Sequence, residues 1–189
     1  DNPKTWLKFL NDVFLGNPKV IGFIKRAIGY SFTGKTDEQC LFMCYGDGSN
    51  GKSVLLNVLR RIGGEYAWTV PFSTLEFDAG GSIPNDVAAM RGKRIVIASE
   101  TGEERINEAK IKSLTGDGTI SARFLHGEFF EFRPEAKIWI ATNNRPTVED
   151  DSYGFWRRIK MIPFKRKFTK EEIDPSIEEK IMKEKDGVL

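Results

Sequence analysis

The sequence has little that would tie it to a membrane or to an oxidising compartment. No apolar run approaches the roughly 18 residues that a membrane-spanning helix needs, and no charged-then-apolar leader resembles a secretion signal. Cysteine is scarce, with two residues in a chain of 189. These features predict a protein of the cytoplasm.

The two cysteines, Cys40 and Cys44, do not predict a disulfide. They stand four residues apart in an apolar run with the composition of a strand, which would separate them by roughly 13 Å on one face of a sheet. A disulfide needs the two α-carbons within about 7 Å of each other. We therefore expect two reduced cysteines in the core.

An excess of charge of one sign is also missing. Lysine and arginine number 29 against 27 acidic residues, which gives a formal net charge of +2. A protein that coats nucleic acid by charge alone would be more basic, so any contact with nucleic acid has to be local. The length fits a single domain, and no repeat or low-complexity linker divides it.

Two predicted helices open the chain, and each begins with Asn-Pro-Lys. Asn2 and Asn17 are the predicted N-caps, because asparagine caps helices and proline suits the first helical position. We assign residues 1–36 to this helical segment, 37–168 to the core, and 169–189 to a charged helical tail expected in solvent or against a neighbouring subunit. A start without methionine and a charged end predict a piece of a longer protein.

Three apolar runs predict strands that are buried on both faces. They are QCLFMCY at 39–45, RIVIAS at 94–99 and KIWIAT at 137–142, with helical patterns between them, one at 107–114. Strands of this kind are typical of a parallel sheet covered by helices on both sides. The predicted fold class is therefore α/β, in three layers.

The first strand leads into a glycine-rich loop with the pattern G-x-x-x-x-G-K-[ST], and a helical pattern follows it. Glycines let backbone amides surround phosphate oxygens, and the start of the helix adds unpaired amides and a positive dipole end. The lysine adds a mobile positive charge for the outer phosphates, and the next hydroxyl suits a magnesium ligand. The predicted nucleotide-binding residues are Gly46, Asp47, Gly48, Ser49, Asn50, Gly51, Lys52 and Ser53, of which Ser53 also holds the metal. The alternative is a turn that only connects strand and helix.

Polar residues follow the other two buried strands at the point where each ends. Glu100 comes after IVIAS, and Asn143 comes after IWIAT. Because parallel strands end at the same edge of a sheet, both side chains should lie beside the phosphate loop. A carboxylate there can polarise the attacking water or hold magnesium, and an amide can orient that water. Taken singly, Glu100 is equally well an exposed carboxylate and Asn143 an ordinary turn residue.

The order of these stretches resembles the superfamily III helicases, the AAA+ motors of small viruses, phages and plasmids. It is most similar to the phage and plasmid primase-helicase branch, through YGDGSNGKS, GKRIVIASE, IKSLTGDGTISARFLHGEFFEF, IWIATNNRP and WRRIKMIPF. The resemblance implies a P-loop NTPase fold of AAA+ type. It further implies that Lys52 and Ser53 belong to the Walker A loop, that Glu100 is the Walker B acid and that Asn143 is the sensor asparagine.

The resemblance also implies an arginine finger, which reaches the nucleotide of a neighbouring subunit. Arg158 in WRRI matches it, with Arg157 as the second candidate. An arginine supplied in this way stabilises charge on the outer phosphate in the transition state, so an isolated subunit should be a poor ATPase. The alternative is a surface pair that makes ion pairs.

A β-hairpin is predicted at 120–132, inserted into the core. Its strands ISARF and FFEF enclose LHGE, in which Gly127 can supply the positive backbone angle of a tight turn. In the helicases this hairpin enters the channel of a ring. The resemblance thus implies DNA contact by His126 at the tip, with Lys112 and Arg123 as supports, whereas composition alone favours a solvated turn for His126.

The predicted function is that of a replicative DNA helicase domain that hydrolyses Mg²⁺-ATP between the subunits of a ring, expected to hold six copies. Its predicted partners are single-stranded DNA, further copies of itself, and a linked primase or origin-binding domain outside this sequence. The expected setting is the cytoplasm of a bacterial host, with a phage or mobile element as the source. The alternatives are a nucleotide-gated DNA-binding or loading ATPase without processive unwinding, and a small-molecule P-loop kinase.

Overall fold

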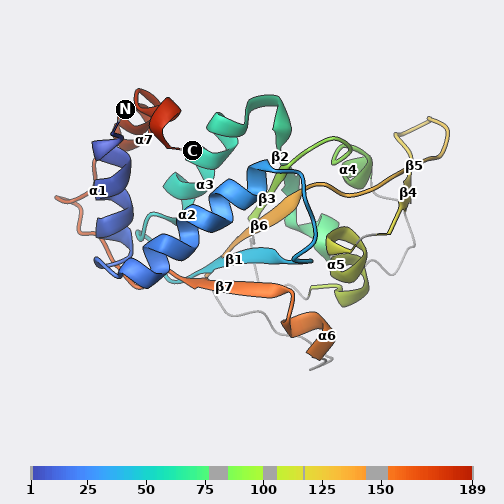
Figure 1. Ribbon diagram of the computed structural model, residues 1–189, viewed down its shortest axis with the longest axis horizontal. Coiled ribbons are helices and arrows are strands. Elements are labelled where there is room, and N and C mark those ends of the chain that lie inside the picture. Colours follow the sequence, from blue (N-terminus) through green and yellow to red (C-terminus); the bar gives the residue numbers. More distant parts are fainter. Residues whose placement is uncertain (1, 77–84, 100–105, 117, 144–152, 189) are drawn as a thin grey trace.

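The computed structural model describes residues 2–76, 85–99, 106–116, 118–143 and 153–188. A five-stranded sheet forms the centre of the molecule, and every pair of neighbouring strands in it is parallel (Figure 1). The strands lie in the order β2–β3–β6–β1–β7. Their bounds are β1 Leu41–Tyr45, β2 Ala67–Pro71, β3 Ile95–Ser99, β6 Lys137–Thr142 and β7 Ile159–Pro163.

Helices cover both faces of the sheet, which confirms the predicted layers. One face carries α1 Lys4–Val13, α2 Pro18–Phe32, α3 Lys52–Gly63 and α7 Ile177–Met182. The other carries α4 Asn85–Ala88, α5 Glu108–Thr115 and α6 Tyr153–Trp156, together with the hairpin β4 Ile120–Ala122 and β5 Phe130–Phe132.

The central strand β1 shows why these runs are apolar on both faces. Phe42 and Cys44 point into the core under α1, α2 and α3, whereas Leu41 and Met43 point into the core under α4, α5 and α6. All four side chains are almost fully buried. Successive residues of a strand face opposite sides, so a strand between two helical layers needs apolar side chains at every position. Both cysteines of the chain are buried and free, as expected.

The beginning of α1 differs from the prediction. Asn17 caps α2 as expected, because its Oδ1 accepts hydrogen bonds from the N–H groups of Lys19 and Val20 at 3.1 and 3.3 Å. Asn2 does not cap α1, for which Pro3 stands at the N-cap without a side-chain hydrogen bond. N–H groups at the start of α1 are bound instead by Glu184, whose Oε2 accepts from Thr5 N–H at 2.9 Å.

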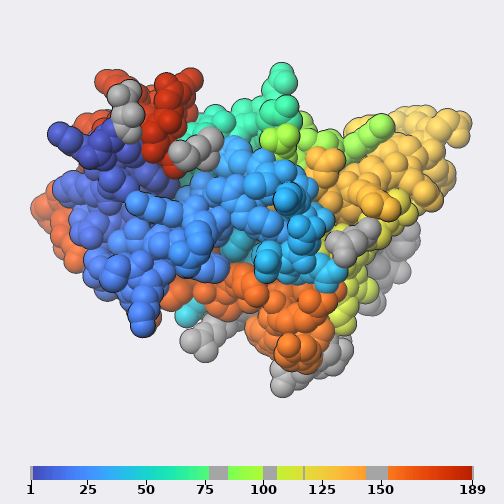
Figure 2. Space-filling view, in the orientation of Figure 1, coloured from blue at the N-terminus to red at the C-terminus, as the bar shows by residue number. Residues whose placement is uncertain are grey.

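The sequence predicted that the tail lies in solvent or against a neighbouring subunit. Residues 169–173 are exposed, but the rest of the tail differs from the prediction. It packs on α1 and α3 of the same chain, where Ile181 is fully buried. Glu179 pairs with Arg61 at 2.7 Å, and Glu178 accepts a hydrogen bond from Asn57 at 2.9 Å. Figure 2 shows the C-terminal segment in red against the N-terminal helix in blue. The two ends of the chain therefore share one corner of the domain.

Replacing Glu184 by alanine is expected to lower the melting temperature by a few degrees, because α1 loses its cap. The hydrogen bond from the Thr5 hydroxyl is the main cause that lowers the pKa of Glu184 below its usual 4.5. A carboxylate with a depressed pKa stabilises the fold above its unfolded pKa, and this stabilisation is lost as the pH falls through the folded value. The difference in urea midpoint between wild type and variant should therefore shrink on acidification from about pH 7 towards about pH 3. Asp186→Ala, an acid of the same segment, is the control and should leave the midpoint unchanged.

The hairpin exists, but its turn is built differently from the prediction. Ala122 pairs with Phe130, so the strands are shorter and the loop longer than expected. The turn is closed by a hydrogen bond of 2.8 Å from Gly127 N–H to Phe124 O. The positive φ of 61° belongs to His126 and not to Gly127. His126 is the third residue of this turn, and a positive φ at the third position alone is characteristic of a type II turn.

Among the described residues, no helix is long and apolar enough to span a membrane.

Candidate functional site

The glycine-rich loop joins β1 to α3 in a conformation that needs glycine at two positions. Gly46 has φ +145°, and a Cβ there would lie 2.4 Å from the carbonyl oxygen of Phe164. Gly51 has φ +89°, and a Cβ there would lie 2.8 Å from Val13 Cγ2. Both angles are in the region that side chains rarely adopt. The two glycines therefore let the loop pass close to β7 on one side and α1 on the other.

Asn50 holds this loop together from within. Its side chain is 3% exposed. Its Oδ1 accepts from the N–H of Lys52 at 3.2 Å, and its Nδ2 donates to the carbonyls of Asp47 and, at 3.4 Å, Phe164. The sequence identified Asn50 as a loop residue only, since no local pattern indicates that its amide ties the loop to the end of β7.

Lys52 directly follows the glycine-rich loop and folds back towards it, and the residue is only 7% exposed. Its ammonium donates to the carbonyl oxygens of Gly46 and, at 3.3 Å, Asp47. Burial lowers its pKa below the usual 10.5. Among the described residues the hydrogen-bond partners of the ammonium are neutral oxygens, and the Asp47 carboxylate acts on it as a nearby charge. The ammonium can therefore bind an anion that enters the loop.

Asn143 lies beside Lys52, as the ends of the strands predicted. Its Oδ1 is 3.4 Å from Lys52 Nζ although the residues are 91 positions apart in the sequence. Strand β6 runs parallel to β1, with Thr142 opposite Tyr45, so both strands end at the same edge. Ser99 closes the next strand at that edge, opposite Ala141. Glu100 itself lies outside the described residues.

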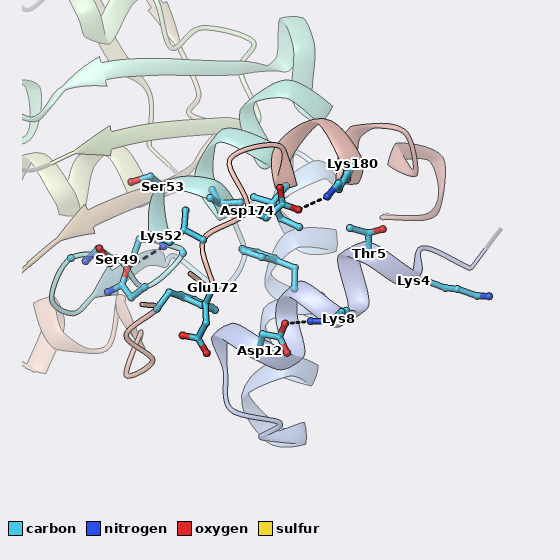
Figure 3. Close-up of a pocket in the computed structure, with 18 of the residues that line it drawn as sticks. Lys4, Thr5, Lys8, Asp12, Ser49, Lys52, Ser53, Glu172, Asp174 and Lys180 are labelled. Carbon is cyan, nitrogen blue, oxygen red and sulfur yellow. Dashed lines mark hydrogen bonds and ion pairs between the residues drawn. The ribbon is translucent and has the colours of Figure 1, made fainter. Parts of the chain in front are cut away.

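Two pockets open on either side of Ser53. One, of about 670 Å³, lies between the loop, α1 and the C-terminal segment (Figure 3). The other, of about 940 Å³, runs along α3 towards β2. Ser53 is exposed and lines both, so its hydroxyl can be reached by a metal ion bound to phosphate. In the described part of the chain no cluster of three acidic, histidine or cysteine side chains forms a metal site of its own.

The loop fits the phosphates of a nucleotide with its magnesium ion. The fit rests on the two glycines with positive φ in the loop, on a buried lysine whose described hydrogen-bond partners are neutral, and on the exposed hydroxyl next to it.

The two candidate finger residues lie at the opposite edge of the sheet. Arg158 directly precedes β7, and the first residue of β7 is opposite Leu41, whereas the phosphate loop follows Tyr45 at the other end of β1. Five strand residues separate the two edges by roughly 16 Å. The guanidinium of Arg158 contacts the carbonyl of Gly154 and, at 3.4 Å, Gln39 Oε1. Exposed Arg157 donates to the same Gln39 oxygen at 2.6 Å. Neither arginine can reach the loop of its own chain.

The structure brings two of the three predicted DNA contacts together. His126 and Arg123 are exposed on the hairpin, which extends from the body of the molecule (Figures 1 and 2). Lys112 lies apart from them, in α5, where it is 3.8 Å from Glu108 and rests against Gly154 of α6. The guanidinium of Arg123 lies 4.9 Å above the ring of Phe129, which is 56% exposed. An arginine next to an exposed aromatic ring is a surface that can stack on nucleobases.

A family of unknown function, DUF5906, matches residues 44–158, which is more than half of the chain. The chain belongs to this family. The matched segment begins in β1, includes the phosphate loop, β3, the hairpin and β6, and ends at Arg158. It leaves out α1, α2, β7 and the C-terminal segment.

Relatives of the chain are viral proteins named as helicases and primases. A protein of Acanthamoeba polyphaga mimivirus named "putative helicase" is 31% identical over 151 residues, which cover 78% of this chain and 16% of the viral protein. A primase of fowlpox virus is 31% identical over 145 residues, 71% of this chain and 18% of that protein. A helicase-named protein of Frog virus 3 is 28% identical over 153 residues, 77% of this chain and 16% of its own. The chain thus spans less than a fifth of these relatives.

The fold is shared with a solved structure, the NrS-1 C-terminal region in its apo form. The TM-score is 0.78 at 17% sequence identity, and the match covers all of this chain and 44% of the other. At this identity the likeness shows the α/β fold with its parallel central sheet.

Proposed function

We propose that the chain is the motor of an ATP-dependent DNA helicase of the superfamily III, AAA+ type. The observation that carries the proposal is the convergence of Lys52, at the phosphate loop, and Asn143, at the end of β6, on one edge of the parallel sheet. A lysine expected to bind phosphate and an asparagine expected to orient the attacking water therefore lie side by side at this edge. The names of the viral relatives support the same function.

ATP would supply the phosphoanhydride bond that is hydrolysed, and Mg²⁺ would shield the negative charge of its phosphates. The loop amides and Lys52 bind the phosphates, and Ser53 presents its hydroxyl to the metal side. Asn143 orients a water molecule towards the outer phosphate, since its amide lies within reach of Lys52. Glu100 is the proposed base, because it directly follows Ser99 at this edge.

A ring completes this site. Arg158 and Arg157 lie too far from the loop of their own chain, so a finger has to come from a neighbouring subunit. The hairpin then faces the track of single-stranded DNA, with His126 and Arg123 near the backbone and Phe129 near the bases. Because the chain spans only a part of its relatives, we propose that the complete protein also carries a primase or origin-binding domain.

The test is ATP hydrolysis with and without single-stranded DNA over a range of protein concentrations, beside Lys52→Ala. The rate per subunit should rise with both protein concentration and DNA, and the variant should be inactive. A rate that responds to neither would contradict the ring motor. Displacement of a strand from a forked duplex separates a helicase from an ATPase that only loads or binds DNA.

A further inference from the structure

The pocket of about 670 Å³ is larger than the phosphate loop requires. The loop forms only one of its walls, and α1 and the C-terminal segment form the others. In Figure 3 Ser49 and Lys52 lie on one side, Lys8 and Asp12 of α1 on the other, and Glu172 of the C-terminal segment between them. A volume of this size is typical of pockets that enclose a whole small-molecule ligand.

The two ends of this pocket differ in charge. At the loop, the hydrogen-bond partners of the Lys52 ammonium within the described part of the chain are neutral oxygens. Away from the loop, Lys8 is paired with Asp12 at 2.5 Å, and Lys180 is paired with Asp174 at 2.5 Å. A third lysine at the end away from the loop, Lys4, lies close enough to the Glu184 carboxylate to lower its pKa further, beyond the main effect of the Thr5 hydroxyl. Each lysine at that end thus has an acidic neighbour, whereas the hydrogen bonds of Lys52 go to neutral oxygens. Such a pocket suits a ligand with an anionic end and an uncharged end.

The wall from the C-terminal segment is apolar where it meets the loop. The N–H of Phe168 donates to the carbonyl of Ser49 at 2.8 Å, which fixes this segment to the phosphate loop. Ile173, five residues further on, lines the same pocket and is 49% exposed. An exposed aliphatic side chain in a mostly apolar pocket is stabilised when an apolar part of a ligand covers it, because apolar surface is then removed from water.

From this arrangement we infer that the pocket between α1 and the C-terminal segment binds the nucleoside half of ATP, with Ile173 and Phe168 packed against the base. The inference rests on the proposed function, because the phosphates must lie in the loop for the base to reach Ile173. It assigns a binding role to a segment that lies outside the family match at 44–158.

The test is calorimetric titration of the whole chain with ATP and, separately, with inorganic tripolyphosphate. Ile173→Asn should weaken ATP binding by roughly three- to tenfold, since part of an isoleucine side chain loses its contact with the base. Tripolyphosphate should bind as tightly as it does to the wild type. Leu15→Asn is the matched control, because Leu15 is also exposed, at 59%, and does not line the pocket.

Two results would overturn the inference: an unchanged affinity for ATP, or an equal loss for ATP and tripolyphosphate. Lys52→Ala tests the proposed function separately and should lose affinity for both ligands. If Lys52→Ala binds both as the wild type does, the phosphate loop is not the site and the proposed function fails. If Lys52→Ala behaves as expected and Ile173→Asn does not, only the nucleoside assignment is wrong.

Discussion

Mixing two inactive variants, Lys52→Ala and Arg158→Ala, is expected to restore ATP hydrolysis in the presence of single-stranded DNA. Each variant alone should be inactive, and loss of an arginine finger costs about 10³–10⁵ in rate. In a mixed ring some sites combine Lys52 from an Arg158→Ala chain with Arg158 from a Lys52→Ala neighbour. Random mixing of equal amounts gives about a quarter of such sites, and thus about a quarter of the wild-type rate.

The position of Arg158 in the fold is the reason for this expectation. It precedes β7 at the amino end of the strand, whereas the phosphate loop follows the carboxyl end of the parallel strand β1. The separation of roughly 16 Å exceeds the reach of an arginine side chain. Arg157→Ala, measured in the same way, decides between the two arginines, since only loss of the finger should be rescued by Lys52→Ala chains.

A purely structural role of Arg158 makes a different prediction. Both arginines donate to Gln39, so Gln39→Gly removes a contact of each while leaving the guanidinium groups in place. Glycine suits the positive φ of 45° at this position. A finger predicts that Gln39→Gly remains active, and a structural role that acts through Gln39 predicts that it loses activity as Arg158→Ala does. Absence of restoration in the mixture would likewise place the role of Arg158 within its own chain.

The elements that were predicted well are those whose cause is local. Burial on both faces of β1, β3 and β6 requires continuous apolar runs, and these can be seen in the sequence. The loop pattern also predicted where Lys52 lies, and the ends of the strands predicted its neighbour Asn143. A rule that links sequence position to the edge of a sheet is sufficient for such contacts.

The errors arose where the partner is distant in the sequence. Thr5 is bound by Glu184, 179 positions away, and no pattern near Asn2 shows that a carboxylate from the other end will take the place of its cap. The burial of Ile181 depends on α1 and α3 in the same way. The sequence did contain a signal for the pocket wall that the C-terminal segment forms, because Phe168 and Ile173 interrupt an otherwise charged stretch.

The hairpin shows a different kind of error. The sequence placed the turn correctly, but assigned its positive φ to Gly127 because glycine adopts such angles most easily. The hydrogen bond from Gly127 to Phe124 makes His126 the third residue of the turn, and His126 has the positive angle. The hydrogen bond that closes the turn therefore fixes which residue has the positive angle, and the conformational preference of glycine does not.

Gly46→Ala is expected to abolish ATP binding and to lower the free energy of unfolding by about 3 kcal/mol. The new Cβ would lie 2.4 Å from the carbonyl oxygen of Phe164 and 3.0 Å from the amide of Asn50, at a φ of +145°. Neither neighbour can retreat freely. The N–H of Phe164 donates to Tyr45 O at 2.8 Å, and the amide of Asn50 holds the loop. The loop itself therefore has to move.

Gly48→Ala separates this strain from a general effect of alanine in the loop. A Cβ at position 48 would meet no atom within 4 Å, and the φ of Gly48 is not positive. The Gly48→Ala protein should therefore be as stable in urea as the wild type. The Gly46→Ala protein should unfold at a lower urea concentration than the wild type. At temperatures where it is still folded, it should bind neither ATP nor tripolyphosphate. A Gly46→Ala chain that binds both as the wild type does would show that the loop accommodates a side chain there. In that case phosphate binding would not depend on the close contact between the loop and the end of β7.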